Sequence, residues 1–362
     1  MTAELKIPTR DEAMARQVEA GGKIAAVFPI HYSRALLRAF GLLPVEVWGP
    51  PGRDTTLGDA HLQAYTCSIV RSGLSFIKEG KLDHAALILV PHACDSLQGL
   101  GSALLDFVKP GPPVQTLYMP RGRRACDVEF LTQELSRLYA ALAEITGEEP
   151  DDLALLACAR REEQADAALA ELLETRPRLG LTNREFYRLA RCREYLPAEA
   201  FEPLCRQALT LARDQEPSGP RVVLSGLVPE PMALLDVLDD AGIMVAADDM
   251  ACCGRRLYPA GQGEAPLRRM ASSLLGAAPD ATLGCSVSER IKHLVSLCQR
   301  ADATGVVHHD IKFCEPEQFY LPQVNTGLAA AGVRTLSLEV DLADPLPDQV
   351  VTRLEAFAEG LA

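Results

Sequence analysis

The chain has 362 residues, of which 48% are apolar and 23% charged, as expected for a globular protein of two or three domains rather than for a disordered chain. Its net charge of −13 disfavours binding to nucleic acid or to an anionic membrane surface, because an acidic protein repels phosphate groups. The longest apolar stretch, at 85–90, is far shorter than a membrane-spanning helix, and the first residues show no apolar signal segment, so we expect a cytoplasmic protein.

Short β-branched runs alternate with helical patterns over residues 1–125. The predicted strands are 23–28, 44–48, 85–90 and 114–118. The predicted helices between them are 33–40, 63–78 and 102–107. Such alternation is typical of a parallel sheet covered by helices.

Residues 126–215 are rich in Ala, Leu, Arg and Glu, with helical periodicity and almost no strand signal. A polar connector with Pro and Gly follows at 214–220. The alternation then returns, with predicted strands at 221–225, 243–247, 305–308 and 335–340 and predicted helices at 231–239, 287–300 and 318–331. We therefore predict an α/β protein in which two flavodoxin- or Rossmann-like parallel-sheet domains, 1–125 and 216–362, flank a helical layer, 126–215.

Eleven cysteines are an unusual number for a protein without a secretory signal. Cytoplasmic cysteines are reduced thiols, and a surplus of them favours a metal or cluster site. Many free cysteines are simply small buried apolar residues. We expect that role for the cysteines in helical patterns, namely Cys158, Cys192, Cys205 and Cys298.

Three other cysteines lie where ligands bind in α/β folds, at the carboxyl ends of strands. Cys94 follows the third predicted strand of the first half, and Cys314 follows the third strand of the second half. Cys67 stands at or just before a helix start, where a thiolate is stabilised. Asp95 and Glu315, directly after two of these cysteines, are expected to cap helices. No C-x-x-C spacing is present, so the pattern alone leaves both a three-thiolate centre and buried structural thiols open.

Several segments in a common order carry a resemblance to a known family. They are ALLRAFGLLPVEVWG at 35–49, YTCS at 65–68, LVPHACDSLQ at 89–98, LSG at 224–226, AADDMACCGRRLY at 246–258 and GVVHHDIKFCEPEQF at 305–319. Together they resemble the 2-hydroxyacyl-CoA dehydratase / benzoyl-CoA reductase subunit family. Only the helical middle of the chain lacks matching motifs.

This resemblance implies that Cys67, Cys94 and Cys314 hold a 4Fe–4S cluster with one open iron position. It further implies low-potential, one-electron reduction of an acyl-CoA thioester, in a hetero- or homodimer with a homologous second subunit. A separate ATP-hydrolysing iron–sulfur activator is the expected electron donor, and this chain has no G-x-x-x-x-G-K-[ST] motif of its own.

The remaining cysteines leave other interpretations open. Cys126, Cys252 or Cys253, and Cys285 bring the possible ligands to six, as in the branch whose 8Fe–9S double-cubane cluster reduces small molecules. The alternative for Cys252 and Cys253 is a buried turn in which the two side chains point apart. A protein that only relays electrons through its cluster, and a cluster-free binding protein, are further alternatives.

Two polar segments have no settled role. His31 and Ser33 lie in a loop where the family usually has other residues, and they are either hydrogen-bond donors to an acyl oxygen or the start of a helix with Ser33 as its N-cap. Asp248-Asp249 and Arg255-Arg256 either recognise a partner or a CoA phosphate, or form an ordinary ion-paired loop.

Overall fold

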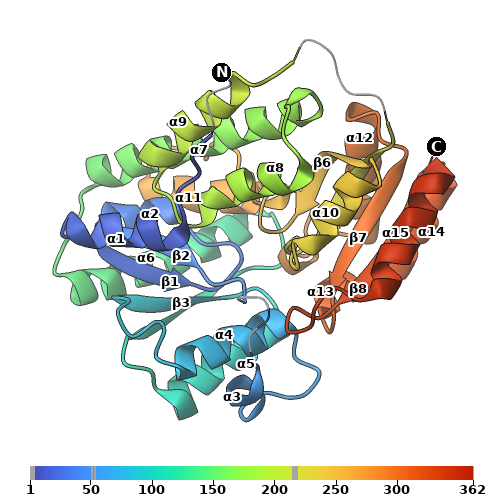
Figure 1. Ribbon diagram of the computed structural model, residues 1–362. Coiled ribbons are helices and arrows are strands. Elements are labelled where there is room, and N and C mark those ends of the chain that lie inside the picture. Colours follow the sequence, from blue (N-terminus) through green and yellow to red (C-terminus); the bar gives the residue numbers. More distant parts are fainter. Residues whose placement is uncertain (1–4, 50–51, 53, 214–218, 362) are drawn as a thin grey trace.

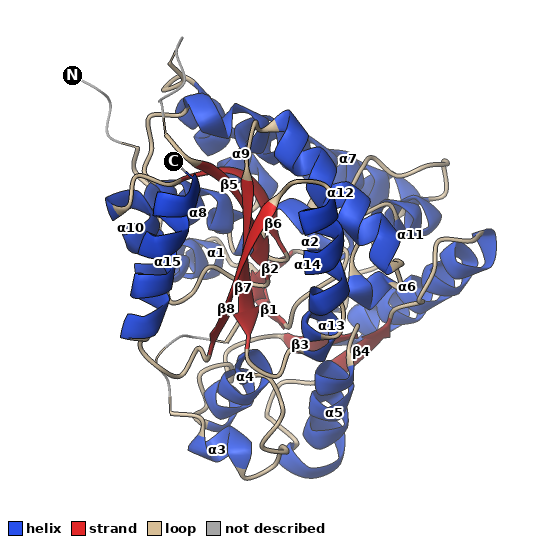
Figure 2. Cartoon of the chain, turned by 90° about the vertical axis from the view of Figure 1, so that its right-hand side faces the viewer, coloured by secondary structure: helices blue, strands red, loops and turns tan. Residues whose placement is uncertain are grey.

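The computed structural model describes residues 5–49, 52, 54–213 and 219–361, and within them the chain forms two separate four-stranded parallel sheets. The predicted α/β class is thereby confirmed. Figure 2 shows the strands of both sheets in the middle of the molecule with helices around them. The domain limits 1–125, 126–215 and 216–362 stay a prediction.

The first sheet has the order β2-β1-β3-β4, and all its pairs are parallel. Its strands are β1 (Lys23–Val27), β2 (Leu42–Glu46), β3 (Leu87–His92) and β4 (Val114–Tyr118). All five residues of β2 and the first five of β3 are buried, as expected for strands covered on both faces. The associated helices are α1 (Arg10–Glu19), α2 (Arg34–Ala39), α3 (Thr56–Asp59), α4 (Ser68–Lys78) and α5 (Asp95–Ala103).

The second sheet repeats this order as β6-β5-β7-β8, again with parallel pairs only. Its strands are β5 (Arg221–Gly226), β6 (Met244–Met250), β7 (Gly305–Ile311) and β8 (Arg334–Val340). The helices of this half are α10 (Ala233–Asp240), α11 (Pro266–Leu275), α12 (Val287–Arg300), α13 (Glu315–Gln318), α14 (Leu321–Ala330) and α15 (Asp348–Leu361). The two halves of the chain thus form sheets with the same strand order.

Long helices fill the middle of the chain, as its composition predicts. They are α6 (Ala125–Thr146), α7 (Asp152–Thr175), α8 (Asn183–Ala190) and α9 (Ala198–Leu209). Figure 1 shows α7, α8 and α9 in green on the side of the molecule away from α3. None of the described helices is both long enough and apolar enough to cross a membrane. Five residues of the predicted 214–220 connector, 214–218, lie outside the described part of the chain.

Residues 102–107 are helical as predicted, but the helix starts seven residues earlier than expected. The helix begins at Asp95, directly after Cys94, and ends at Ala103. A π-helical turn over Leu104–Val108 follows it. The error matters for the site, because the helix starts at the cysteine and not further along the loop.

Candidate functional site

Three helices begin directly after a cysteine. Cys67 is the N-cap of α4, Cys94 of α5 and Cys314 of α13. The expectation that Asp95 and Glu315 cap these helices is therefore wrong, since each lies in the first turn after the capping cysteine. None of the three thiols makes a side-chain capping bond of the kind that Ser or Asp makes. The sulfurs of Cys67 and Cys94 are thus placed at the positive ends of α4 and α5.

The three cysteines line one cavity of about 50 Å³. Cys94 and Cys314 come from different sheets, following β3 and β7, and Cys67 precedes α4. The carboxyl edges of the two sheets therefore meet at this cavity. The other walls are mainly apolar and include Ile30, Trp48, Ile69, Val70, Leu97 and Leu227.

Burial controls the protonation of these thiols. It raises the pKa of Cys67, although a hydrogen bond from the Val70 backbone N–H acts in the opposite direction. It raises the pKa of Cys94 to about 12. Burial also raises the pKa of Cys314 well above its usual range, and the nearby Glu317 carboxylate adds to the effect. Without a positively charged ligand, all three side chains are neutral thiols at pH 7.

Within the described residues, no three His, Cys, Asp or Glu side chains are grouped closely enough to hold a single metal ion. The cavity is therefore not a preformed site of the zinc type, in which one ion takes all its ligands. Three thiols spread around a larger space suit a ligand with several attachment points.

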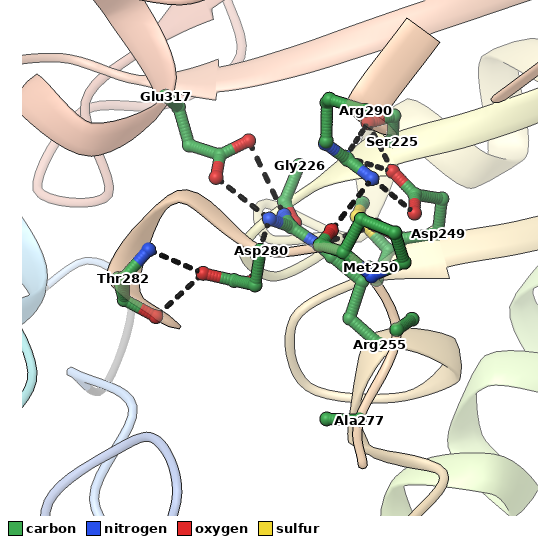
Figure 3. A network of polar contacts seen from close by, with 12 residues as sticks. Ser225, Gly226, Asp249, Met250, Arg255, Ala277, Asp280, Thr282, Arg290 and Glu317 are labelled. Carbon is green, nitrogen blue, oxygen red and sulfur yellow. Dashed lines mark hydrogen bonds and ion pairs between the residues drawn. The ribbon is translucent and has the colours of Figure 1, made fainter. Parts of the chain in front are cut away.

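Two carboxylates on the wall of the cavity are held by one buried arginine. Arg255 has no exposed surface, and its guanidinium donates to Asp280 Oδ2 at 3.0 Å and to Glu317 Oε1 at 2.6 Å. It also donates to the main-chain oxygens of Gly226 and Asp249, at the ends of β5 and β6. Figure 3 shows Arg255 between these partners. The Arg255 side chain thus connects α13, which directly follows Cys314, to two strands of the second sheet.

The predicted role of Ser33 as an N-cap fits its position. Its Oγ accepts a hydrogen bond from the Leu36 backbone N–H at 3.2 Å at the start of α2, and Ser33 lies outside the cysteine cavity. His31 is fully buried behind the cavity wall, where its Nε2 lies 2.9 Å from Thr282 Oγ1 and its Nδ1 3.2 Å from the Tyr258 hydroxyl. Burial lowers the pKa of His31 to about 4, so its ring is neutral at pH 7. A catalytic role for either residue stays a prediction.

The four additional cysteines do not line the described cavity. Cys126 is exposed in the first turn of α6, and Cys285 is buried just before α12. Cys252 and Cys253 form a buried turn after β6, as one alternative predicts. Their side chains do not point apart, however, because their Sγ atoms are 3.6 Å from each other.

The segment that contains Arg255 and Arg256 is an interior ion-paired loop. Arg256 pairs with Glu46, which also accepts hydrogen bonds from the Tyr32 hydroxyl at 2.7 Å, from Arg34 at 2.6 Å and from the Trp48 indole at 2.7 Å. Both arginines are buried and therefore closed to a CoA phosphate or a protein partner in this arrangement.

Sequence reasoning did not find the acidic residues at and near the cavity, of which Asp280 and Glu317 line it. Glu46, Asp280 and Glu317 lie in different parts of the sequence, and each becomes significant only through its arginine partner. The one signal in the sequence was the Arg255-Arg256 pair itself, because adjacent arginines after a buried strand require buried acceptors.

Thiol labelling tests the burial of these cysteines. In native apoprotein at neutral pH, we expect iodoacetamide to modify Cys94 on the order of a hundredfold more slowly than the exposed Cys126, because a raised pKa leaves little thiolate. Mass spectrometry of timed samples measures both rates. In urea the two rates should converge; equal rates in the native protein would contradict the described cavity.

Comparison with known proteins adds an independent line of evidence. The family model described as 2-hydroxyglutaryl-CoA dehydratase, D-component, matches residues 29–361. The chain is 26% identical to lactoyl-CoA dehydratase subunit beta of Anaerotignum propionicum, over 95% of this chain and 93% of that one. It is 25% identical to (R)-2-hydroxyglutaryl-CoA dehydratase, subunit beta, of Acidaminococcus fermentans, over 98% and 97%. It is 24% identical to a benzoyl-CoA reductase subunit of Thauera aromatica, over 85% and 83%.

Proposed function

Because the chain belongs to the 2-hydroxyglutaryl-CoA dehydratase, D-component, family, we propose that it is the iron–sulfur subunit of an ATP-activated, radical-type acyl-CoA dehydratase or benzoyl-CoA reductase-like enzyme. Membership confirms the resemblance carried by the sequence motifs. The names of the relatives support an acyl-CoA substrate, since they are subunits of lactoyl-CoA and 2-hydroxyglutaryl-CoA dehydratases and of a benzoyl-CoA reductase.

The observation that carries the proposal is the convergence of Cys67, Cys94 and Cys314 on one cavity. Thiolate sulfur is the ligand that iron–sulfur clusters prefer, and a four-iron cubane takes each thiolate on a different iron atom. The donor set therefore fits a 4Fe–4S cluster better than a single ion. When bound, such a cluster supplies single electrons at low potential.

The surrounding residues support this use of the cavity. The starts of α4 and α5 place backbone N–H groups and positive helix ends at Cys67 and Cys94, and the backbone N–H of Glu317 acts on Cys314. These groups favour the thiolate form once a cation compensates the burial. The apolar walls exclude water. Arg255 engages the Asp280 and Glu317 carboxylates, so that neither is a free charge beside the thiolates.

Partner proteins follow from the same reasoning. Each of these relatives is named as one subunit of its enzyme, and two of them as the beta subunit, so we propose a homologous second subunit for this chain. The absence of a G-x-x-x-x-G-K-[ST] motif in the sequence supports a separate ATP-hydrolysing activator as the electron source.

Metal analysis tests the proposal. Protein purified without oxygen should contain about four irons and four acid-labile sulfides per chain, as a single cubane requires. Serine variants of Cys67, Cys94 and Cys314 should each lose most of this iron. The matched control is Cys298→Ser, since Cys298 is equally buried but packs in α12 against Leu294 and Val306.

Each outcome has a defined meaning. About eight irons per chain would replace the single cubane with the double-cubane alternative and direct attention to Cys126, Cys252, Cys253 and Cys285. A Mössbauer spectrum in which the fourth iron has a fixed protein ligand would favour an electron-relay protein over a catalytic one. No iron after anaerobic reconstitution would overturn the proposal.

A further inference from the structure

A second cavity, of about 350 Å³, lies against the first sheet and shares one wall with the cysteine cavity. Its volume is in the range of small-molecule binding sites, and the cysteine cavity is much smaller. Its floor consists of Ile24 and Ala26 on one face of β1 with Val45 of β2 beside them. Helices α1 and α4 contribute to the sides.

The cavity runs along the strands. Its exposed end includes Lys81 and His84, just before β3, and its buried end includes Trp48, just after β2. His84 lies three residues before Leu87, the partner of Ala25. Trp48 lies two residues after Glu46, the partner of Val27, so the two ends are about seven residues apart along the sheet. At 3.3 Å per residue this corresponds to roughly 20 Å. The cavity therefore suits an elongated ligand.

Trp48 forms the shared wall. It lines both cavities, and its indole N–H donates to Glu46 Oε2 at 2.7 Å, which fixes the ring. A chain-like ligand that fills the second cavity thus ends beside the space that the three cysteines surround.

The polar groups of this cavity are few and differ from end to end. At the exposed end, the side chains of Lys81 and His84 make no hydrogen bond or ion pair with the described residues. Asp11 lies at the other end, next to Arg10, whose guanidinium donates to the Glu46 main-chain oxygen. In the interior, Glu230 is nine-tenths buried and pairs with Arg191 through one carboxylate oxygen. Its other oxygen, Oε2, has no hydrogen-bond partner among the described residues. The site therefore offers the unpaired Lys81 ammonium group outside and an unused acceptor oxygen of Glu230 inside.

We propose that this cavity binds the pantetheine arm of a CoA thioester; the choice of ligand rests on the proposed function. The arm is long and largely apolar, and its amide N–H groups suit the unpartnered oxygen of Glu230. The CoA phosphates then lie outside, near Lys81 and His84, and the acyl end reaches Trp48. A simple fatty acid has no donor for Glu230, and a nucleotide alone does not fit apolar walls.

The sequence provides a direct reporter, because Trp48 is the only tryptophan of the chain. Pantetheine and coenzyme A added to anaerobic apoprotein should each change the tryptophan emission in a saturable way. Adenosine 3′,5′-bisphosphate, which lacks the arm, should not. Equilibrium dialysis with labelled coenzyme A measures the same binding without relying on the fluorophore.

Two variants separate the arm from the phosphates. Ala26→Leu fills the floor of the cavity and should weaken both pantetheine and coenzyme A by about tenfold or more. Lys81→Glu, at an exposed position, should weaken coenzyme A by about fivefold and leave pantetheine unchanged. The charge control is Lys292→Glu on the exposed side of α12, which should change neither. Circular dichroism confirms folding, and Lys81→Glu keeps the test valid if Ala26→Leu does not fold.

The result also distinguishes this inference from the function on which it rests. Iron in the expected amount together with no binding by dialysis overturns the pantetheine site and leaves the cluster proposal intact. Binding that Ala26→Leu and Lys81→Glu do not alter, or equal binding of adenosine 3′,5′-bisphosphate, also overturns it. Pantetheine binding to a chain that takes up no iron supports the cavity and rejects the cluster.

Discussion

Replacing Glu46 with Gln is expected to destabilise the protein by about 3–5 kcal/mol, the typical cost of breaking a buried ion pair by removing one partner. The Glu46 carboxylate has no exposed surface and compensates two buried guanidinium groups, those of Arg34 and Arg256. Gln cannot balance these charges, although it has nearly the same shape. Urea unfolding of the variant measures the loss.

The matched control is Glu129→Gln. Glu129 also pairs with an arginine, Arg268, but 57% of its side chain is exposed. Exposed pairs contribute about 0–1 kcal/mol, so this variant should unfold almost like the parent protein. Equal stability losses in the two variants would show that the buried ion pair contributes no more to the free energy of unfolding than the exposed one.

The pH dependence provides a second test of Glu46. Burial opposes ionisation of this carboxyl group, but Arg256 and Arg34 outweigh it and lower its pKa from 4.5 to about 2. The group therefore stabilises the folded state fully above pH 4.5, and this contribution disappears as the pH falls to about 2. The stability difference between parent and Glu46→Gln should narrow over that interval and stay constant above it.

Replacing Arg255 with Met should lower the free energy of unfolding by a similar amount, about 3–5 kcal/mol. The substitution leaves the Asp280 and Glu317 carboxylates without their cation. It should also release the segment that carries Cys314, since Arg255 joins α13 to the ends of β5 and β6. Hydrogen exchange should therefore increase at residues 314–320 more than in the strands of the first sheet.

Two further variants calibrate the Arg255 result. Arg255→Lys keeps the charge but lacks the planar fork that serves several acceptors at once, so an intermediate loss is expected. Arg206→Met removes an arginine whose side chain is 54% exposed and pairs with Glu171, and it should be nearly neutral. If hydrogen exchange at residues 314–320 is the same in Arg255→Met as in the parent protein, Arg255 does not position this segment.

The regular parts of the fold could be predicted from sequence because each depends on neighbours in the chain. The strand over 114–118 and the helix over 287–300 have the predicted limits in the structure. The start of α5 was predicted too late because the helix contains Gly99 and Gly101, which disfavour helices locally by about 1 kcal/mol each. A Cβ at Gly101 would lie 2.4 Å from His92 Nε2, so the packing of α5 against β3 requires glycine at this position. The same glycine weakens the helical pattern in the sequence.

The candidate site was only partly predictable for a related reason. The three cysteines follow recognisable motifs, and their positions after strand ends were visible in the sequence. The ion pairs at the cavity wall were not, because Arg255 is 25 residues from Asp280 and 62 residues from Glu317, and no periodicity connects them. Such pairs form only in the folded protein.

The shared strand order of the two sheets has a consequence for assembly. Within each sheet, every strand pairs with strands of the same half of the chain, so each half can form its own sheet. Cys94 and Cys314 belong to different halves and meet only after the halves dock. Any ligand that needs both residues binds the docked arrangement alone and therefore shifts the docking equilibrium towards it by mass action. Such a ligand holds the two halves together. When it is lost, the first change should be a more variable orientation of one half relative to the other.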